Sequence, residues 1–449
     1  YLDDMAHKCI GRVLTYPNGL DASVVRRRER QRRVVLEVLG GEPRDWNDHN
    51  WHLENTLTDL DSISKIVELT PEEEESISLA SWLGVPFGIT PFYISLMDPG
   101  VDMEMDHALR AQVIPRLQCL KATSEQFGRG GMEVLDFMRE GYSSPTKMVT
   151  RRYPMIAIFK PYNSCAQFCA YCQRNWEIGK PADCKKDQDY EDAFRWFEEH
   201  PTVSEVLITG GDPLVLGDST LSRILSRFAG MRHIKHLRIG SRLPVVLPMR
   251  FTELLLSLLE QVIRPPDLDI SIVTHFESAY EISPDAFQAV QSLRRRGIMV
   301  YNQQVFTFEN CRRFETVALR LGLKRIGIDP YYTFNTKGKE ETEHFRVPIS
   351  RILQERMEEA RLIPGLSRTD ETVFNIPGQG KNPLCAGQHH ELIMIAPSGE
   401  RVYEFHPWEK NLALASTYVY RDVPIGAFLR RLEERGESAD DYASIWYYF

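Results

Sequence analysis

Apolar segments of strand length alternate with amphipathic helical stretches through the middle of this 449-residue chain, and this alternation restricts its fold more than any other feature. Successive apolar segments start roughly 30 residues apart, which is the spacing of repeated strand–helix units. Such units place their strands parallel, joined by right-handed crossovers. The expected strands are Met155–Phe159, Glu205–Thr209, His236–Gly240, Asp269–Thr274, Val300–Val305 and Arg325–Asp329. The expected helices are Tyr190–Glu199, Ser219–Phe228, Thr252–Ile263, Pro284–Arg296, Cys311–Leu321 and Ile349–Leu362.

Two architectures fit this alternation, an open partial barrel and a doubly wound sheet. The strand–helix units are fewer than the eight of a closed barrel, so we favour an open barrel of six strands. The expected regions are a helical N-terminal region over 1–150, the barrel over 151–363 and a C-terminal extension over 364–449.

The two flanking regions carry local signals of their own. In the N-terminal region, Thr70 and Glu73 form a capping box that opens a helix. In the extension, a Gly/Pro loop spans Ile376–Pro383. Beyond it, Leu392–Ala396 and Arg401–Phe405 predict a β-hairpin.

Charge and composition exclude several classes of protein. The chain has 63 acidic and 54 basic residues, which gives a formal net charge of −9. Because nucleic-acid-binding domains are usually basic, we expect no nucleic-acid partner. No stretch approaches the roughly 18 uninterrupted apolar residues of a membrane span. The eight cysteines do not form a disulfide framework, and three of them lie close together, which favours a metal in a reducing compartment. We therefore expect a cytoplasmic protein without a membrane partner.

Cys165, Cys169 and Cys172 form a CxxxCxxC motif directly after the first expected strand. Parallel α/β sheets place their ligands at this end of a strand. Thiolates suit zinc and iron–sulfur clusters, but structural zinc takes four ligands and the chain has no second CxxC. Three thiolates on a [4Fe–4S] cluster leave one iron open, where S-adenosyl-L-methionine (SAM) can bind. The motif predicts a radical SAM enzyme; a zinc site completed by a distant residue and a ferredoxin lacking its fourth cysteine remain as alternatives.

Gly210, Gly211 and Asp212 end the second expected strand. Glycines at this position let the backbone approach a ligand closely. Taken alone, the sequence is an ordinary turn. One strand–helix unit after the cysteine motif, it resembles the motif that holds the SAM amino group in radical SAM enzymes.

Beyond these motifs, the chain resembles the lysine 2,3-aminomutase family over nearly its whole length. The segments that carry the resemblance are Trp46–Trp51, Leu69–Glu75, Ile89–Leu96, Ile239–Pro248, Thr274–Phe276 and Glu343–Arg346. The resemblance implies a partial (β/α)6 TIM-like barrel with a helical N-terminal region and a small C-terminal α/β extension. It implies an isomerase that moves an α-amino group to the β-carbon with a [4Fe–4S] cluster, SAM and pyridoxal 5′-phosphate (PLP). The family-implied cofactor residues also include Ser241, Arg242, His275 and Gln303.

The resemblance assigns further residues to PLP and the substrate. Lys381 is expected to bind PLP covalently as the catalytic lysine, which needs a neutral amine. Arg152 is expected at the PLP phosphate. Arg174, two residues after Cys172, is expected to bind the substrate α-carboxylate through its guanidinium fork. Without the family, Lys381 and Arg152 would be read as surface charges.

Two positions depart from the lysine-acting members, which clasp the substrate ε-ammonium with two aspartates. Lys337 and Asn375 stand at these positions. A lysine 4 Å from an ammonium costs roughly 4 kcal/mol at an effective dielectric near 20. The same pair resembles glutamate 2,3-aminomutases, so we expect L-glutamate to become β-glutamate, with aspartate, a neutral amino acid or lysine as alternatives. A Lys337 that points to solvent would say nothing about the substrate.

The family resemblance also bears on partners. Members often bind zinc between subunits through a C-terminal cysteine cluster, but Cys385 is the last cysteine here and Cys311 has no companion, so we expect no such zinc. We expect a homo-oligomer, a dimer or tetramer, and a reductant protein of the flavodoxin or ferredoxin type. A translation-factor-modifying radical SAM relative and a non-enzymatic Fe–S redox protein are the alternative functions.

Overall fold

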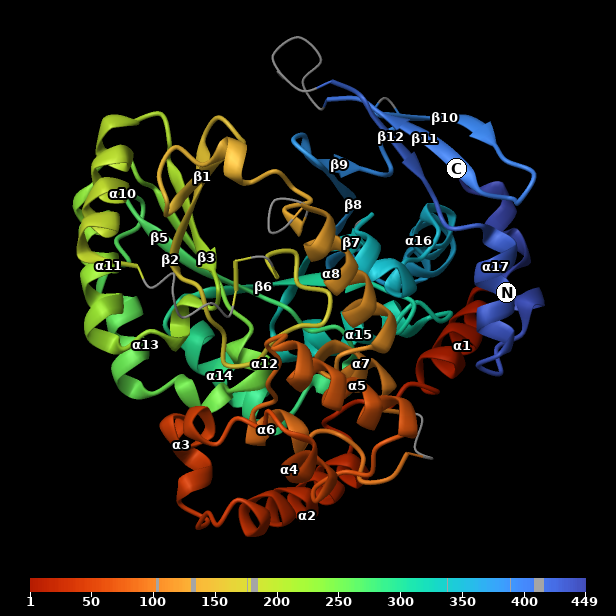
Figure 1. The fold of residues 1–449 in the computed structure, drawn as a ribbon, viewed down its shortest axis with the longest axis horizontal. Coiled ribbons are helices and arrows are strands. Elements are labelled where there is room, and N and C mark those ends of the chain that lie inside the picture. Colours follow the sequence, from red (N-terminus) through yellow and green to blue (C-terminus); the bar gives the residue numbers. More distant parts are fainter. Residues whose placement is uncertain are drawn as a thin grey trace.

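A curled sheet of strands in sequence order forms the centre of the molecule (Figure 1). The structure is a computed structural model that describes residues 1–101, 105–130, 135–175, 177–178, 185–336, 338–387, 389–407 and 416–449, without the side chains of residues 126–130. The strands of this sheet are β1 Val149–Arg151, β2 Ile156–Tyr162, β3 Glu205–Gly210, β4 His236–Gly240, β5 Asp269–Thr274, β6 Met299–Phe306, β7 Asp329–Asn335, β8 Glu371–Ile376 and β9 Gly380–Pro383.

The sheet is an open barrel, as predicted. β2 to β8 run parallel, while β1 and β9 lie antiparallel at the two edges. Within the described residues, the strand order ends at β1 and at β9 and does not return to its start. The partial barrel is therefore confirmed, with β8 as a parallel strand beyond the six expected.

Helices cover the outer face of the sheet (Figure 1). They are α10 Asp187–Glu199, α11 Asp218–Gly230, α12 Leu243–Val246, α13 Glu253–Gln261, α14 Pro284–Arg295, α15 Glu315–Ile326 and α16 Ile349–Gln354. Alternate strand residues such as Val206 and Ile208 are buried in the core beneath these helices. The residues between them are half-buried and often polar, for example Glu205, Arg238 and Gln303. Because side chains alternate between the two faces of a strand, the lumen of the barrel is lined by polar groups.

One expected strand is misplaced. Arg325 and Ile326 belong to the end of α15 and not to a strand. Gly327 then ends the helix in the left-handed conformation, with a φ of +87°, and β7 begins at Asp329. The expected strand Arg325–Asp329 is wrong because apolar residues lie on both sides of Gly327, so the hydrophobic pattern does not mark where the helix ends and the strand begins.

The N-terminal region packs into the same core as the barrel. Its helices are α1 Leu2–Val13, α2 Ala22–Val38, α3 His49–Glu54, α4 Leu60–Ser64, α5 Pro71–Leu83, α6 Pro91–Ile94, α7 His107–Val113 and α8 Leu117–Gly130. The predicted capping box of Thr70 and Glu73 is confirmed at the start of α5. Ile77 and Phe92 share one hydrophobic core with Phe159 of β2. These helices are therefore held against the barrel by buried apolar contacts.

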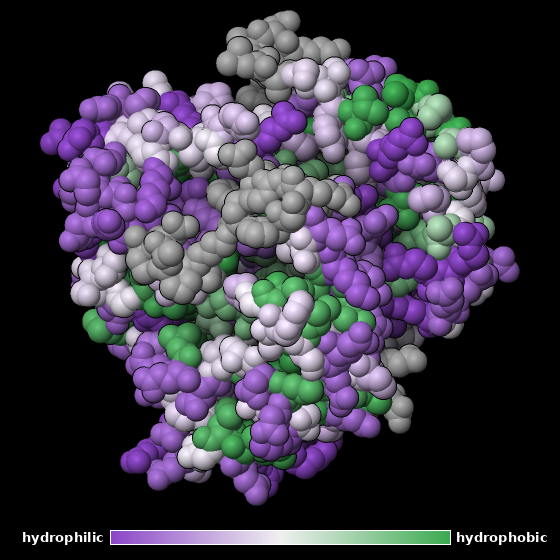
Figure 2. All heavy atoms as spheres, in the orientation of Figure 1, coloured by the Kyte–Doolittle hydropathy of each residue, from purple (hydrophilic) through white to green (hydrophobic). Residues whose placement is uncertain are grey.

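The C-terminal extension has a second, smaller sheet and its own apolar cluster. Its elements are β10 His390–Ile395, β11 Arg401–Phe405, β12 Tyr418–Arg421, α17 Ile425–Glu433 and the 3₁₀ segment Ala439–Tyr447. The predicted hairpin is confirmed by the antiparallel pairing of β10 with β11. Figure 2 shows apolar side chains at the surface over this sheet, where Ile393, Ile395 and Val419 are exposed. Across the described part of the chain, no helix combines the length and apolar character needed to span a membrane.

Candidate active site

The cysteine motif lies in the loop that leaves β2, against the turn that ends β3. The Gly211 N–H donates to the Tyr162 carbonyl at 2.8 Å, and the Asp212 N–H donates to the Ser164 carbonyl at 2.9 Å. A Cβ on Gly211 would lie 2.1 Å from the Ser164 carbonyl oxygen. Gly210 has a φ of +122°, a conformation that favours glycine. The two glycines thus bring the β3 turn into backbone contact with the cysteine loop.

Replacing Gly211 with alanine should push the two segments apart and lower the iron content of the purified protein. We expect a loss of about 1–3 kcal/mol in stability, as for other overpacked sites. Iron per chain and the midpoint of thermal unfolding measure the effect. Gly230→Ala is the matched control, because a Cβ there has nothing within 4 Å. Equal iron contents and midpoints in the two variants would contradict the contact.

Asp212 ties the ends of β3 and β4 together. Its carboxylate accepts hydrogen bonds from the Ser241 hydroxyl at 3.0 Å, the Arg242 backbone N–H at 2.8 Å and the Leu214 N–H at 3.1 Å. Burial raises the pKa of Asp212 to about 6. Four of the predicted cofactor residues, Gly210, Gly211, Ser241 and Arg242, are thereby brought to one edge of the barrel beside the cysteine loop.

The donors around the cysteines suit a thiolate-bound cluster. The Arg242 guanidinium donates to the Cys169 sulfur at 3.1 Å, and the Arg174 backbone N–H donates to the Cys172 sulfur at 3.4 Å. In the part of the chain that the structure describes, no three His, Cys, Asp or Glu side chains converge to hold a single metal ion. A [4Fe–4S] cluster takes one thiolate per iron, so it does not need the sulfurs to converge on one ion. The soft donor set and its hydrogen bonds fit such a cluster.

The N-terminal region supports the cysteine loop directly. The Ala170 N–H, between Cys169 and Cys172, donates to the Gln112 carbonyl of α7 at 2.7 Å. The Tyr171 hydroxyl donates to Gln112 Oε1 at 3.1 Å. The sequence predicted no functional role for this helix. Contacts of this kind join residues far apart in the chain and leave no local pattern.

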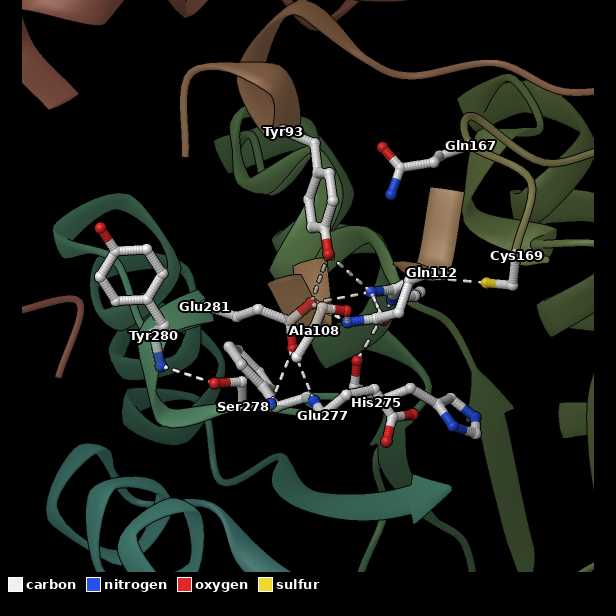
Figure 3. A network of polar contacts seen from close by, with 12 residues as sticks. Tyr93, Ala108, Gln112, Gln167, Cys169, His275, Glu277, Ser278, Tyr280 and Glu281 are labelled. Atoms are coloured by element: carbon white, nitrogen blue, oxygen red, sulfur yellow. Dashed lines mark hydrogen bonds and ion pairs between the residues drawn. The ribbon is translucent and has the colours of Figure 1, made fainter. Parts of the chain in front are cut away.

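Arg242 sits at the centre of a buried polar network, which Figure 3 shows from close by. Its guanidinium donates to Glu281 at 2.8 Å, to the Tyr93 hydroxyl at 3.2 Å and to Gln112 Oε1. Its Nε donates to the His275 carbonyl at 3.3 Å. The His275 ring points away from Tyr93 and Glu281 (Figure 3). His275 therefore meets this network through its backbone.

Lys381 lies on β9, in a short hairpin with β8 and not in a loop as expected. Asn375 is its direct cross-strand neighbour, so the two side chains project to the same face. The Lys381 ammonium lies 4.9 Å from the ring centre of Tyr332 and 5.2 Å from that of Tyr153. Gln303 of β6 is paired in register with Tyr332. The structure thus brings three predicted residues, Lys381, Asn375 and Gln303, to one region of the lumen.

The surroundings of Lys381 favour its neutral amine. Burial lowers the pKa of Lys381 to about 8, and the nearby positive charges of Arg238 and Arg152 act in the same direction. Glu371 opposes them. A neutral amine is the form that can attack a carbonyl carbon. Lys381 therefore fits a lysine that binds PLP covalently.

The rate at which PLP attaches to the protein should rise with pH through about 8 and then level off. Below that value the folded protein holds Lys381 mainly as an ammonium; above it the amine is free to react. Stopped-flow absorbance after mixing with PLP, over a range of pH, measures the rate. A midpoint near the ordinary lysine value of about 10.4 would contradict the assignment.

Arg174 and Arg152 share a buried carboxylate that the sequence did not reveal. Arg174 forms a bidentate pair with Glu140, at 2.9 and 3.0 Å, and Arg152 lies 3.8 Å from the same carboxylate. Burial alone would raise the pKa of Glu140, but the two arginines lower it to about 2. Glu140 uses the Nε and Nη2 atoms of Arg174, so it fixes the plane of the guanidinium. Arg152, predicted to bind the PLP phosphate, and Arg174, predicted to bind the substrate α-carboxylate, are thus linked through the Glu140 carboxylate.

Lys337 lies outside the described residues, but the segment that follows it is anchored on the cysteine loop. The Lys339 ammonium donates to Asn175 Oδ1 at 2.8 Å and to the Cys172 carbonyl at 3.4 Å. It also pairs with the buried Glu341 at 2.6 Å. These contacts hold the backbone two residues from Lys337 beside the cysteine motif.

The chain is similar in sequence to a KamA family protein and to 2,3-aminomutases. An uncharacterised KamA family protein of Methanocaldococcus jannaschii is 44% identical over 445 residues, 97% of this chain and 71% of its own. Glutamate 2,3-aminomutase of Clostridioides difficile is 33% identical, covering 79% of this chain and 80% of its own. L-lysine 2,3-aminomutase of Bacillus subtilis is 31% identical, covering 86% and 73%.

Two further comparisons add nothing to these relatives. No protein-family model matches the chain. A solved radical S-adenosylmethionine methyltransferase of Kitasatospora setae aligns at 14% identity with a TM-score of 0.29, over 41% of this chain and 37% of its own. That score is too low to support a comparison of folds.

Proposed function

The chain belongs to the KamA family of radical SAM 2,3-aminomutases, and we propose that it moves the α-amino group of L-glutamate to the β-carbon, giving β-glutamate. It is an isomerase that works with a [4Fe–4S] cluster, SAM and PLP. Relatives that act on lysine and on glutamate are both similar to it, so the choice of substrate rests on the chain's own residues.

The position of Asn375 carries the proposal. This amide is buried directly across from Lys381, where it can donate N–H groups to a substrate carboxylate. An ammonium at the same place would lack a charged acceptor. Lys337, at the first position of the pair, would neutralise a carboxylate and repel an ammonium by about 4 kcal/mol at ~4 Å and an effective dielectric near 20. Both residues favour a side-chain carboxylate.

Each charged group of the substrate and cofactors then has a partner in this chain. The cluster ligands would be Cys165, Cys169 and Cys172. The residues for the SAM amino group would be Gly210, Gly211 and Asp212, and Ser241, Arg242, His275 and Gln303 would be further cofactor-binding residues. Lys381 would bind PLP and Arg152 its phosphate. When bound, these cofactors supply the radical and stabilise it, while the protein supplies position and electrostatics.

The two carboxylates of the substrate would orient it, one bound by an arginine and the other by a lysine and an amide. Arg174, held in its plane by Glu140, offers the end of its guanidinium to the α-carboxylate. Lys337 and Asn375 would hold the carboxylate of the side chain. Fixing both ends of the molecule would hold its α- and β-carbons in one position while the amino group moves between them.

A competition among amino acids tests the proposal. The anaerobically reconstituted protein is incubated with dithionite, SAM, PLP and equal amounts of glutamate, aspartate, lysine and alanine. We expect β-glutamate to dominate the products. β-Lysine formed at an equal or higher rate would overturn the choice of substrate, and an absence of SAM cleavage would overturn the radical chemistry.

A further inference from the structure

The Arg242 guanidinium is aimed at one sulfur of the cysteine motif. Its Nη1 donates to Cys169 at 3.1 Å, whereas Cys172 accepts from a backbone N–H at 3.4 Å. The Arg242 side chain is only 10% exposed, so water screens this contact weakly. A full positive charge is therefore held in hydrogen-bond contact with a thiolate in a buried site.

Partners on separate elements keep Arg242 in this position (Figure 3). Tyr93 of α6 and Gln112 of α7 contact the guanidinium from the N-terminal region. Glu281, which follows β5, accepts from Nη2 at 2.8 Å. The backbone N–H of Arg242 is bound to Asp212 at 2.8 Å. The guanidinium cannot turn away from the sulfur without losing several of these bonds.

Glu281 is itself fully buried and held in place by several hydrogen bonds. Its second oxygen accepts from the Glu277 N–H at 2.6 Å and the Ser278 N–H at 3.2 Å. Its first oxygen also accepts from the Tyr93 hydroxyl at 2.7 Å. No hydrogen bond from Glu281 to a cysteine is found among the described residues. The Arg242–Glu281 ion pair is thus held rigidly, with its positively charged member in contact with the Cys169 sulfur.

A fixed positive charge beside a cluster ligand favours the reduced cluster, which carries one more negative charge. Hydrogen bonds to the sulfurs and local charge are established determinants of cluster potential. We propose that Arg242, held by Glu281, Gln112 and Tyr93, is a positioning residue that makes the cluster easier to reduce. In this step the cluster gains one electron from an external one-electron reductant, and no bond is made or broken in the protein.

This role is separate from any contact of Arg242 with SAM, so it is tested without SAM. It rests on the cluster role of the cysteine motif and is independent of the substrate. EPR-monitored redox titration of the anaerobically reconstituted holoenzyme gives the cluster potential, with dithionite as the reductant. Iron and sulfide content, measured on each variant, shows whether the cluster is present.

Two substitutions should shift the potential in opposite directions. Arg242→Gln removes the cation and should lower the ratio of reduced to oxidised cluster at a given potential at least tenfold, or 59 mV for one electron. Glu281→Gln leaves the cation without its counter-charge and should raise that ratio. Arg250→Gln is the control: Arg250 is also buried but donates to the Leu214 carbonyl and to no cysteine, so the potential should stay at the wild-type value.

The outcomes separate this inference from the proposed function. A wild-type protein that assembles no cluster would overturn the function itself. A normal cluster whose potential is the same in wild type and Arg242→Gln, within a twofold ratio, would overturn the inference alone. If Arg242→Gln assembles no cluster, Glu281→Gln decides: a raised ratio supports the inference, and an unchanged or lowered ratio overturns it.

Discussion

Replacing Lys381 with alanine is expected to abolish aminomutase turnover, with a loss on the order of a thousandfold or more, equivalent to about 4 kcal/mol of transition-state stabilisation. The reason is that no other described lysine combines burial between two tyrosine rings with a pKa lowered to about 8. Without a neutral amine, PLP cannot attach covalently. The variant should also lose the absorbance band of protein-bound PLP.

Two controls separate this loss from general damage. Lys235→Ala changes an exposed lysine and should keep both the band and the turnover. Lys381→Arg keeps a cation near Tyr153 and Tyr332 but offers no reactive amine, so it should fold normally and still lack the band. A PLP band of wild-type strength in Lys381→Ala would reject Lys381 as the PLP lysine.

The double substitution Lys337→Asp with Asn375→Asp is expected to convert the substrate preference toward lysine. Removing one repulsion of about 4 kcal/mol and adding two acceptors should raise the lysine-to-glutamate ratio of kcat/KM on the order of a thousandfold. The measurement is steady-state turnover of each amino acid by the wild type and the double variant. Glutamate turnover should fall, because its side-chain carboxylate would then face two like charges.

The single variants test whether the two positions act together. Asn375→Asp places a carboxylate across from Lys381, which would favour the ammonium form, so PLP loading has to be measured alongside turnover. Lys337→Asp alone should weaken glutamate turnover without that side effect. A double variant that loads PLP and keeps the wild-type preference would show that these residues do not contact the substrate side chain.

The fold could be predicted where a strand is bounded by clear breaks. β4 and β5 have the expected bounds, His236–Gly240 and Asp269–Thr274. The strand after α15 could not be placed, because apolar residues continue from the helix across Gly327. β8 and β9 were missed for a different reason. Short strands around Gly378 look like a loop in the sequence. They join the sheet only because β8 pairs with β7 and β9 pairs with β8.

The site could be predicted where chemistry is concentrated in a short motif. The cysteines belong to this class, whereas Lys381 was predicted only through the family resemblance; the structure gives both suitable surroundings. Glu140, Gln112 and Glu281 do not, because they meet their arginines across separations of 34, 130 and 39 residues. No local pattern records such contacts. The domain boundaries, the oligomeric state and the reductant protein stay predictions.

An intramolecular amino shift on a dicarboxylic amino acid can be followed by isotope labelling of L-glutamate. The reconstituted protein is incubated anaerobically with SAM, PLP, dithionite, uniformly ¹³C,¹⁵N-labelled L-glutamate and an excess of unlabelled ammonium. NMR should show β-glutamate with ¹⁵N bonded to ¹³C at C3 and no dilution of the label. Glutamate left with its ¹⁵N only at C2, under conditions in which the protein cleaves SAM and converts lysine, would contradict the claim.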